Sequence, residues 1–332
     1  MLLVRLRVSF SPVRCIVAKV LVTGGAGFIG SHMVDAFLAS GYDVAVVDDL
    51  SSGKREQVNP RARFYPVDIR NASALAEVFD RERPDFVDHH AAQASVALSV
   101  RDPCRDAETN ILGSINVFEQ ARRIGVRKVV YASTGGALYG EPRYLPCDEE
   151  HPVHPLSPYG ASKYAAEKYL ALFSHLHGVR FTVLRYANVY GPRQDPFGEA
   201  GVVAIFAQKM LRGGQPVIFG TGEQLRDFVY VGDVAEANLL ALERGGGEAF
   251  NIGTEAGVSV NQIFALLTDA TGYGGKPAYE APRPGDVFRI YLKAQKAHTA
   301  LGWAPKVGLE EGLRRTVEFF RGRTPSQEAR GK

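Results

Sequence analysis

The chain has 332 residues, 45% of them hydrophobic, and a formal net charge of +3. This length and apolar content are enough to bury one large or two modest cores, so a disordered chain is not expected. The basic residues are scattered rather than gathered in a stripe, which argues against a nucleic-acid partner. The apolar runs stay well short of the roughly 20 residues of a membrane span, so no membrane partner is expected.

The cysteines and histidines point away from disulfides and metals. The three cysteines are an odd number without CxxC spacing, which fits a reducing, cytoplasmic environment. The pairs His89–His90 and His151/His154 lack cysteine or acidic ligands at metal spacing. We therefore expect no metal, and we interpret these histidines as structural or solvent-facing.

Residues 1–18 are basic, with apolar patches. Arg5 and Arg7 fall inside the apolar part and Pro12 interrupts it, which differs from a targeting segment. The first apolar strand begins directly afterwards. We expect a poorly ordered extension, or a start codon placed too early.

A glycine-rich turn follows the strand expected at residues 19–23 and precedes a helix expected at 28–40. Gly24 would permit the tight turn, Gly27 the close approach of a pyrophosphate, and Gly30 the close packing of helix on strand. The amides at the helix start would face the phosphates. The residues expected at this phosphate site are Gly24, Gly27, Phe28, Ile29 and Gly30. The alternative is an ordinary glycine-rich loop.

Acidic residues end the next two apolar runs. Asp48 follows the strand expected at 43–47, at the spacing at which a carboxylate binds a ribose diol. Such a carboxylate repels a 2′-phosphate, and Asp49 adds to the same charge, so the spacing favours NAD over NADP. Asp68 follows the strand expected at 62–66 and could reach the adenine end. The alternative is a solvated aspartate at a strand end.

Apolar runs and helical patterns alternate through the first half of the chain, which predicts a doubly wound α/β fold with a parallel sheet covered on both faces. Strands are expected at residues 19–23, 43–47, 62–66, 85–89, 127–132 and 180–186. Helices are expected at residues 28–40, 72–82, 104–124 and 158–178. Glycine and proline clusters break the second half, which predicts a smaller, loop-rich lobe.

Tyr159 and Lys163 lie four residues apart in the helix expected at 158–178, so they share one face. A nearby ammonium favours a phenolate, so Lys163 would lower the pKa of Tyr159 and make it a usable base. Lys163 could also hold ribose hydroxyls. The alternative is an amphipathic helix with an exposed tyrosine and lysine.

Two hydroxyl residues, Ser133 and Thr134, follow the strand expected at 127–132. Ligands of doubly wound sheets lie beyond the carboxyl ends of the strands, so these side chains would face a substrate. A hydroxyl there can bridge the tyrosine and a sugar oxygen. The alternative is a structural turn cap.

Together these features resemble the extended short-chain dehydrogenase/reductase family, a Rossmann-fold family, and within it the UDP-glucose 4-epimerases. The likeness covers nearly the whole chain. It is carried by the glycine turn, the Tyr159/Lys163 pair, His89–Ala92, Leu184–Pro192, Arg226–Tyr230 and Arg283–Asp286.

The resemblance implies a role for each matching residue. The catalytic residues would be Thr134, Tyr159 and Lys163. The cofactor contacts would be Gly24, Gly27, Phe28, Ile29, Gly30, Asp48, Asp49, Asp68, Ile69, Ala91, Ala92, Asn110, Ser133, Tyr159, Lys163 and Tyr186. The substrate contacts would be Thr134, Tyr159, Asn188, Phe219, Arg226, Arg283 and Asp286. Phe219 would stack on uracil, and the two arginines would bind the diphosphate, which suits the guanidinium fork.

The resemblance also implies a reaction, the inversion of C4 of a UDP-hexose through a 4-keto sugar with NAD regenerated in each turnover. A 4,6-dehydratase or decarboxylase of the same family is an alternative, but those enzymes usually carry an acidic residue just after the threonine. This chain has Gly135, Gly136 and Ala137 there. A non-catalytic NAD-binding protein is a further alternative, which the presence of Tyr159 and Lys163 disfavours.

Three departures from the family pattern affect details. The loop after Thr134 is one residue longer than in many epimerases, which leaves Ser133 as the alternative catalytic hydroxyl. Gln93 stands near the position of a lysine that contacts the cofactor in many relatives. Ile290, of intermediate size, is the residue expected to limit bulk at C2, and N-acetylated and uronic sugars stay alternatives to UDP-glucose.

The resemblance further implies a division of the chain and a homodimer. Residues 19–188, with 225–252 returning, would bind NAD; residues 189–224 and 253–322 would bind the UDP-sugar; residues 323–332 would be a tail. The helices at 104–124 and 158–178 would form a four-helix bundle with a second copy.

Overall fold

The computed structural model describes residues 17–197, 201–282 and 287–322. Two predicted substrate residues, Arg283 and Asp286, lie outside this part of the chain. Residues 1–16 of the predicted extension also lie outside it.

Seven parallel strands form the central sheet, in the order β11-β6-β5-β4-β1-β2-β3. Their sequences are almost continuously apolar because helices cover both faces. The strands are β1 (Lys19–Thr23), β2 (Asp43–Val47), β3 (Arg63–Tyr65), β4 (Phe86–His89), β5 (Lys128–Thr134), β6 (Phe181–Tyr186) and β11 (Glu248–Ile252).

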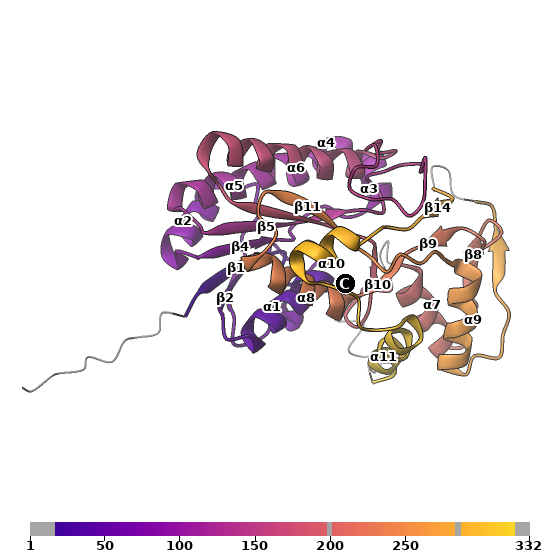
Figure 1. Ribbon diagram of the computed structural model, residues 1–332. Helices are drawn as coiled ribbons and strands as arrows, with labels where there is room; N and C mark the ends of the chain where they lie inside the picture. Colours follow the sequence, from indigo (N-terminus) through magenta and orange to yellow (C-terminus); the bar gives the residue numbers. More distant parts are fainter. Residues whose placement is uncertain (1–16, 198–200, 283–286, 323–332) are drawn as a thin grey trace, which may run out of the picture.

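Helices pack on both faces of this sheet (Figure 1). One face carries α2 (Ala72–Glu82), α3 (Val96–Arg101), α4 (Pro103–Ala107), α5 (Gly113–Ile124) and α6 (Pro158–His177); the other carries α1 (Phe28–Ala39), α8 (Val231–Glu243) and α10 (Gln295–Leu301). A separate apolar cluster fills the space on each side. The doubly wound fold predicted from the sequence is confirmed, and a 3₁₀ turn (Arg55–Gln57) follows β2.

The structure changes two predicted boundaries. The helix expected at 104–124 contains a π-helical turn, Glu108–Leu112, between α4 and α5. The side chain of Asn110 in this turn is buried and hydrogen-bonded, so the local widening of the helix places a polar group inside the protein. The strand expected at 127–132 continues to Thr134, so both candidate hydroxyl residues belong to β5.

The second half of the chain adds three small sheets and three helices around a third apolar cluster. The sheets pair β7 (Asn188–Tyr190) with β10 (Phe228–Tyr230), β9 (Leu225–Arg226) with β12 (Val258–Ser259) and β14 (Arg289–Ile290), and β8 (Val217–Phe219) with β13 (Ala278–Glu280). The helices are α7 (Val202–Leu211), α9 (Val260–Thr271) and α11 (Leu309–Arg321), which lie together at one end of the molecule (Figure 1). None of the helices in the described ranges is long and apolar enough to cross a membrane.

The strand order reverses between β1 and β4, where the chain changes the direction in which it adds strands. Ligands of doubly wound sheets bind at such a switch point. Gly24, directly after β1, has φ +71°, and a Cβ there would lie 2.6 Å from the backbone nitrogen of Ala91 after β4. At Gly24 the two strand ends therefore meet backbone to backbone.

Replacing Gly30 tests this close packing. A Cβ on Gly30 would lie 2.2 Å from the carbonyl oxygen of Gly24. Because backbone atoms cannot yield cheaply, we expect Gly30→Ala to lower the free energy of unfolding by about 1–3 kcal/mol, as measured by chemical denaturation. Gly246→Ala is the control, because a Cβ at Gly246 meets nothing within 4 Å. Equal losses in the two variants would contradict the prediction.

Candidate active site

The glycine turn and the end of β2 form one unit. Gly27 caps α1 without a side-chain hydrogen bond, so the helix presents backbone amides at its start. The buried carboxylate of Asp48 accepts hydrogen bonds from the amides of Ala26, at 2.9 Å, and Leu50, at 2.8 Å. Burial raises the pKa of Asp48. A dinucleotide fits this arrangement, because the amides at the start of α1 have no side-chain cap, the turn is rich in glycine, and the carboxylate of Asp48 lies beside it.

The other predicted acidic contacts, Asp49 and Asp68, bond to residues two positions further along the chain. Asp49 accepts hydrogen bonds from the amide and hydroxyl of Ser51, at 2.9 and 2.6 Å. Asp68 forms an ion pair with Arg70, with an Nη2–Oδ2 distance of 2.6 Å, which lowers the pKa of Asp68. Ile69 is buried in the apolar cluster. A cofactor role for these three residues stays a prediction.

At the end of β4, the two histidines are buried within hydrogen-bond networks. His89 lies between Thr23 and Ser114, with Nδ1–Oγ1 and Nε2–Oγ distances of 2.6 and 2.9 Å. Burial holds the pKa of His89 well below its usual value, so the ring is neutral. His90 pairs with the buried Asp88 at 2.9 Å. The structural interpretation of these residues agrees with this placement, and among the described residues no group of three His, Cys, Asp or Glu is placed to hold a metal.

A second network fixes the segment after β4 to α6. The carboxamide oxygen of Asn110 accepts a hydrogen bond from the amide of Gln93 at 2.8 Å, and its nitrogen lies 3.0 Å from the hydroxyl of Ser162. Gln93 donates to Asp106 at 2.8 Å. Gln93 therefore serves to join α4 to this segment. The neighbouring Ala91 donates its amide to Thr23 at 3.2 Å.

The start of α6 places Tyr159 beside Thr134. Ser157 caps the helix by accepting from the amide of Gly160 at 3.2 Å, and Pro158 occupies its first turn. A Cβ on Gly160 would lie 2.4 Å from the carbonyl oxygen of Ala137, so the helix start packs directly on the segment after β5. As a result the hydroxyl of Tyr159 lies close to that of Thr134, which favours the phenolate.

Burial shifts both members of the Tyr159/Lys163 pair toward their neutral forms. It raises the pKa of Tyr159 to about 12, against the hydrogen bond from Thr134. It lowers the pKa of Lys163 to about 7, against the charges of Glu167 and Asp106. The sequence-based expectation that Tyr159 has a lowered pKa is therefore wrong in direction. The reason is desolvation, which a helical spacing does not reveal.

The hydroxyl of Ser133 hydrogen-bonds to a buried ion pair, between Glu167 and Arg185, that the sequence analysis did not predict. The Ser133 hydroxyl donates to Glu167 Oε1 at 2.5 Å, and Arg185 Nη2 donates to Glu167 Oε2 at 2.7 Å. Arg185 also donates to the hydroxyl of Tyr139 at 3.1 Å. A charged residue inside the apolar run of β6 was the available signal, because a buried arginine needs a partner. Of the two candidate hydroxyls, Thr134 is the one directed to Tyr159.

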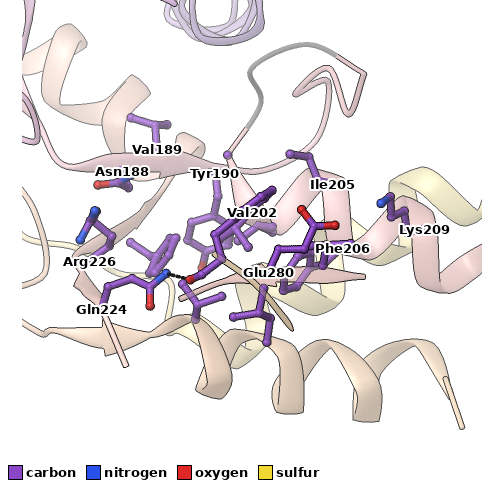
Figure 2. A pocket seen from close by; sticks show the side chains of 17 residues that line it. Asn188, Val189, Tyr190, Val202, Ile205, Phe206, Lys209, Gln224, Arg226 and Glu280 are labelled. Atoms are coloured by element: carbon purple, nitrogen blue, oxygen red, sulfur yellow. Dashed lines mark hydrogen bonds between the residues drawn. The ribbon is translucent and has the colours of Figure 1, made fainter. Parts of the chain in front are cut away.

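A cavity of about 370 Å³ lies between β7, α7, β8, β9 and β10. It brings together the predicted substrate residues Asn188, Phe219 and Arg226. Figure 2 shows Asn188 and Arg226 near each other at one end and Lys209 at the other. The polar lining residues missed by the sequence analysis are Tyr190, Lys209, Gln224 and Glu280. They come from four separate elements or loops without a common motif.

The cavity adjoins the Tyr159 region through Gly136. A Cβ at Gly136 would lie 3.4 Å from Oδ1 of Asn188 and 4.0 Å from Oγ1 of Thr134. Tyr186, a predicted cofactor contact, is buried, and its hydroxyl donates to Asn238 of α8 at 2.9 Å. The arrangement sets the half-buried Tyr159 and the buried Lys163 beside a cavity with an arginine, which suits proton transfer on a bound, negatively charged substrate.

Known proteins resemble this chain in sequence and in fold. Residues 20–253 match the model of the NAD dependent epimerase/dehydratase family. A UDP-glucose 4-epimerase from Mycolicibacterium smegmatis is 44% identical, with 92% of this chain and 99% of that protein covered. A structure of UDP-glucose 4-epimerase with UDP-glucose from Thermotoga maritima has a TM-score of 0.90 at 56% identity and covers 91% of this chain and 98% of its own. One from Thermus thermophilus in complex with NAD has a TM-score of 0.88 at 48% identity, covering 92% and 100%.

The buried ion pair can be tested by stability measurements. Glu167→Gln leaves the charge of Arg185, whose side chain is 7% exposed, without its counter-ion. Breaking a buried pair in this way costs about 3–5 kcal/mol, which chemical denaturation measures as a lower free energy of unfolding. Glu119→Gln is the matched control, because its ion pair with Arg122 is exposed and such pairs contribute at most about 1 kcal/mol. A loss in Glu167→Gln no larger than the control's would show that the pair is not structurally important.

Proposed function

This chain belongs to the NAD-dependent epimerase/dehydratase family, and on that premise we propose that it is a UDP-hexose 4-epimerase that interconverts UDP-glucose and UDP-galactose. The observation that carries the proposal is the placement of Tyr159 and Thr134 beside a cavity that contains Asn188, Phe219 and Arg226. The names of the relatives and solved structures support the same activity.

The chain's own residues fit NAD at the switch point of the sheet. The turn from Gly24 to Gly30, with its uncapped helix start, would hold the pyrophosphate, and Asp48 would hold a ribose. NAD, when bound, supplies reversible hydride exchange with C4 of the sugar, and the sugar passes through a 4-keto form. The protein supplies orientation and charge.

Tyr159 would move the proton of the sugar's 4-hydroxyl. Its phenolic oxygen accepts this proton and later returns it, while Thr134 keeps the phenol oriented through their hydrogen bond. Because burial raises the pKa of Tyr159, its phenolate needs positive charge nearby. Lys163, one helical turn along α6, provides that charge in its protonated form.

The cavity would hold the UDP part of the substrate. Arg226 lies on β9 at the end of the cavity near Asn188 (Figure 2). A diphosphate bound there by Arg226 would place the attached sugar toward Thr134. Phe219, on β8, would stack on the uracil. Arg283 and Asp286 are proposed as further contacts from the family motif alone. Gly135, Gly136 and Ala137 place no acid after Thr134, which supports epimerisation over elimination.

We propose the division of the chain given by the family resemblance. The strand β11 joins the seven-stranded sheet although it follows the first part of the second lobe in sequence, which supports the return of residues 225–252 to the NAD-binding part. The separate apolar cluster around α7, α9 and α11 supports a distinct UDP-sugar lobe.

We further propose a cytoplasmic homodimer. Tyr169, Leu172 and Leu176 on α6 are 41%, 51% and 65% exposed and share one helix face at spacings of three and four residues. Leu112, in the adjacent π-helical turn, is also exposed. Four apolar side chains on this face support a helical bundle with a second copy. Cys104 and Cys147 are free thiols, as a reducing compartment requires.

The activity is tested by incubating the purified protein with UDP-glucose, UDP-galactose, and their N-acetyl and uronic analogues, without added NAD. We expect interconversion of the glucose and galactose forms.

Tyr159→Phe should lower kcat by about 10²–10⁴-fold, because it removes the acid–base group. Thr134→Val should also lower kcat, whereas Ser133→Ala should mainly lower the melting temperature, because it removes one of the hydrogen bonds that the buried Glu167 accepts. An active Tyr159→Phe enzyme would overturn this mechanism, and no interconversion of any pair would overturn the function.

The dimer is tested by light scattering coupled to gel filtration. Leu172→Glu places a charge in the proposed apolar interface, so we expect it to convert dimers to monomers at micromolar concentration. Ala300→Glu on α10 is the control, since it adds the same charge at an exposed helical position elsewhere. A monomeric wild-type protein, or an equally dimeric Leu172→Glu variant, would exclude this interface.

A further inference from the structure

We propose that Tyr131 is a positioning residue, whose aromatic ring holds the buried ammonium of Lys163 in place and in its charged form. The inference rests on the proposed function, in which Lys163 acts as a cation beside Tyr159. Tyr131 lies on β5, three residues before Thr134, and is fully buried. The Nζ atom of Lys163 lies 4.3 Å from the centroid of its ring. At this distance the negative face of the ring attracts a cation.

Several contacts fix the plane of this ring. The hydroxyl of Tyr131 donates to the backbone carbonyl of Lys163 at 3.4 Å. The ring packs at 84° against Phe118, with centroids 6.0 Å apart, and at 40° against His89, with centroids 5.5 Å apart. A ring held at both its edge and its hydroxyl presents a defined face to the ammonium. The ring of Tyr131 is therefore held in place to contact the ammonium of Lys163.

The groups around Lys163 make its charge sensitive to this ring. Burial disfavours the ammonium, while the carboxylates of Glu167 on α6 and Asp106 on α4 favour it. His89 on β4 is neutral, so it adds no competing cation next to the ring. The resulting pKa of Lys163, about 7, lies where a modest loss of stabilisation changes the charged fraction at working pH.

The inference is tested on the purified holoenzyme with Tyr131→Leu and Tyr131→Phe. For each variant kcat and KM for UDP-glucose are measured from about pH 6 to about pH 10, the range in which a lysine of lowered pKa titrates. Tyr131→Leu removes the ring that stabilises the ammonium, so Lys163 should lose its proton at lower pH. The high-pH limb of kcat should move to lower pH, and kcat on that limb should fall about 3- to 30-fold, with KM little changed.

Tyr131→Phe keeps the aromatic face and should restore the high-pH limb toward its wild-type position. Phe79→Leu, in the same apolar cluster but on α2, is the control for a general packing defect. It should lower the melting temperature without moving the pH profile. An unmoved high-pH limb in Tyr131→Leu, or equal displacement in the Leu and Phe variants, would overturn the proposal.

Fluorinated phenylalanines at position 131 keep the test valid if Tyr131→Leu fails to fold. They withdraw electrons from the ring face with little change in size, so the high-pH limb should move stepwise to lower pH as fluorines are added. A limb that does not respond to fluorination would also overturn the proposal. Failure of the proposed function appears separately, as a wild-type enzyme that interconverts no UDP-sugar pair.

Discussion

The buried ion pair between Glu167 and Arg185 is the interaction on which the geometry of the site depends. It joins α6 to β6, and through Ser133 it also joins both to β5. Arg185 extends the network to Tyr139, whose hydroxyl donates to Asn251 of β11 at 2.7 Å. Three strands and the helix that carries Tyr159 and Lys163 thus share one charged network. Since a buried charge is stable only with its partners in place, these elements are held in a single relative position.

Desolvation then sets the chemistry of the two groups that α6 carries. It opposes charge on Tyr159 and on Lys163 alike, so each resists the ionised form that a proton transfer requires. The neighbouring groups partly offset this desolvation, each at one of the two side chains. Thr134 favours the phenolate through a hydrogen bond, whereas Glu167 and Asp106 favour the ammonium through their charges. The pKa values of such a pair shift when a ligand brings charge into the site, and perturbed pKa values are typical of catalytic groups.

The parts of this structure that local sequence determines were predictable. The glycine turn and the alternation of strands and helices follow from backbone rules and apolar patterns that act within a few residues. The contacts that complete the site join distant positions, such as Ser133 with Glu167 and Gln93 with Asp106, and depend on how α4 and α6 pack. The pKa of Tyr159 was predicted in the wrong direction because spacing does not report burial. The cavity residues Lys209, Gln224 and Glu280 share no motif, so only the fold brings them together.

The chain crosses between the large sheet and the third apolar cluster several times, and hydrogen bonds tie these crossings to each other. The amide of Ala187 donates to Ile252, at 2.9 Å, and that of Asn188 to Asp227, also at 2.9 Å. The buried carboxylate of Asp227 in turn accepts from the amide of Thr254 at 2.8 Å and from that of Leu292 at 3.2 Å. A hinge needs a few free backbone torsions, and here each strand of the connection is restrained by another. The connection that carries the cavity is therefore restrained at several points, and the cavity should keep its shape rather than open and close with the lobes.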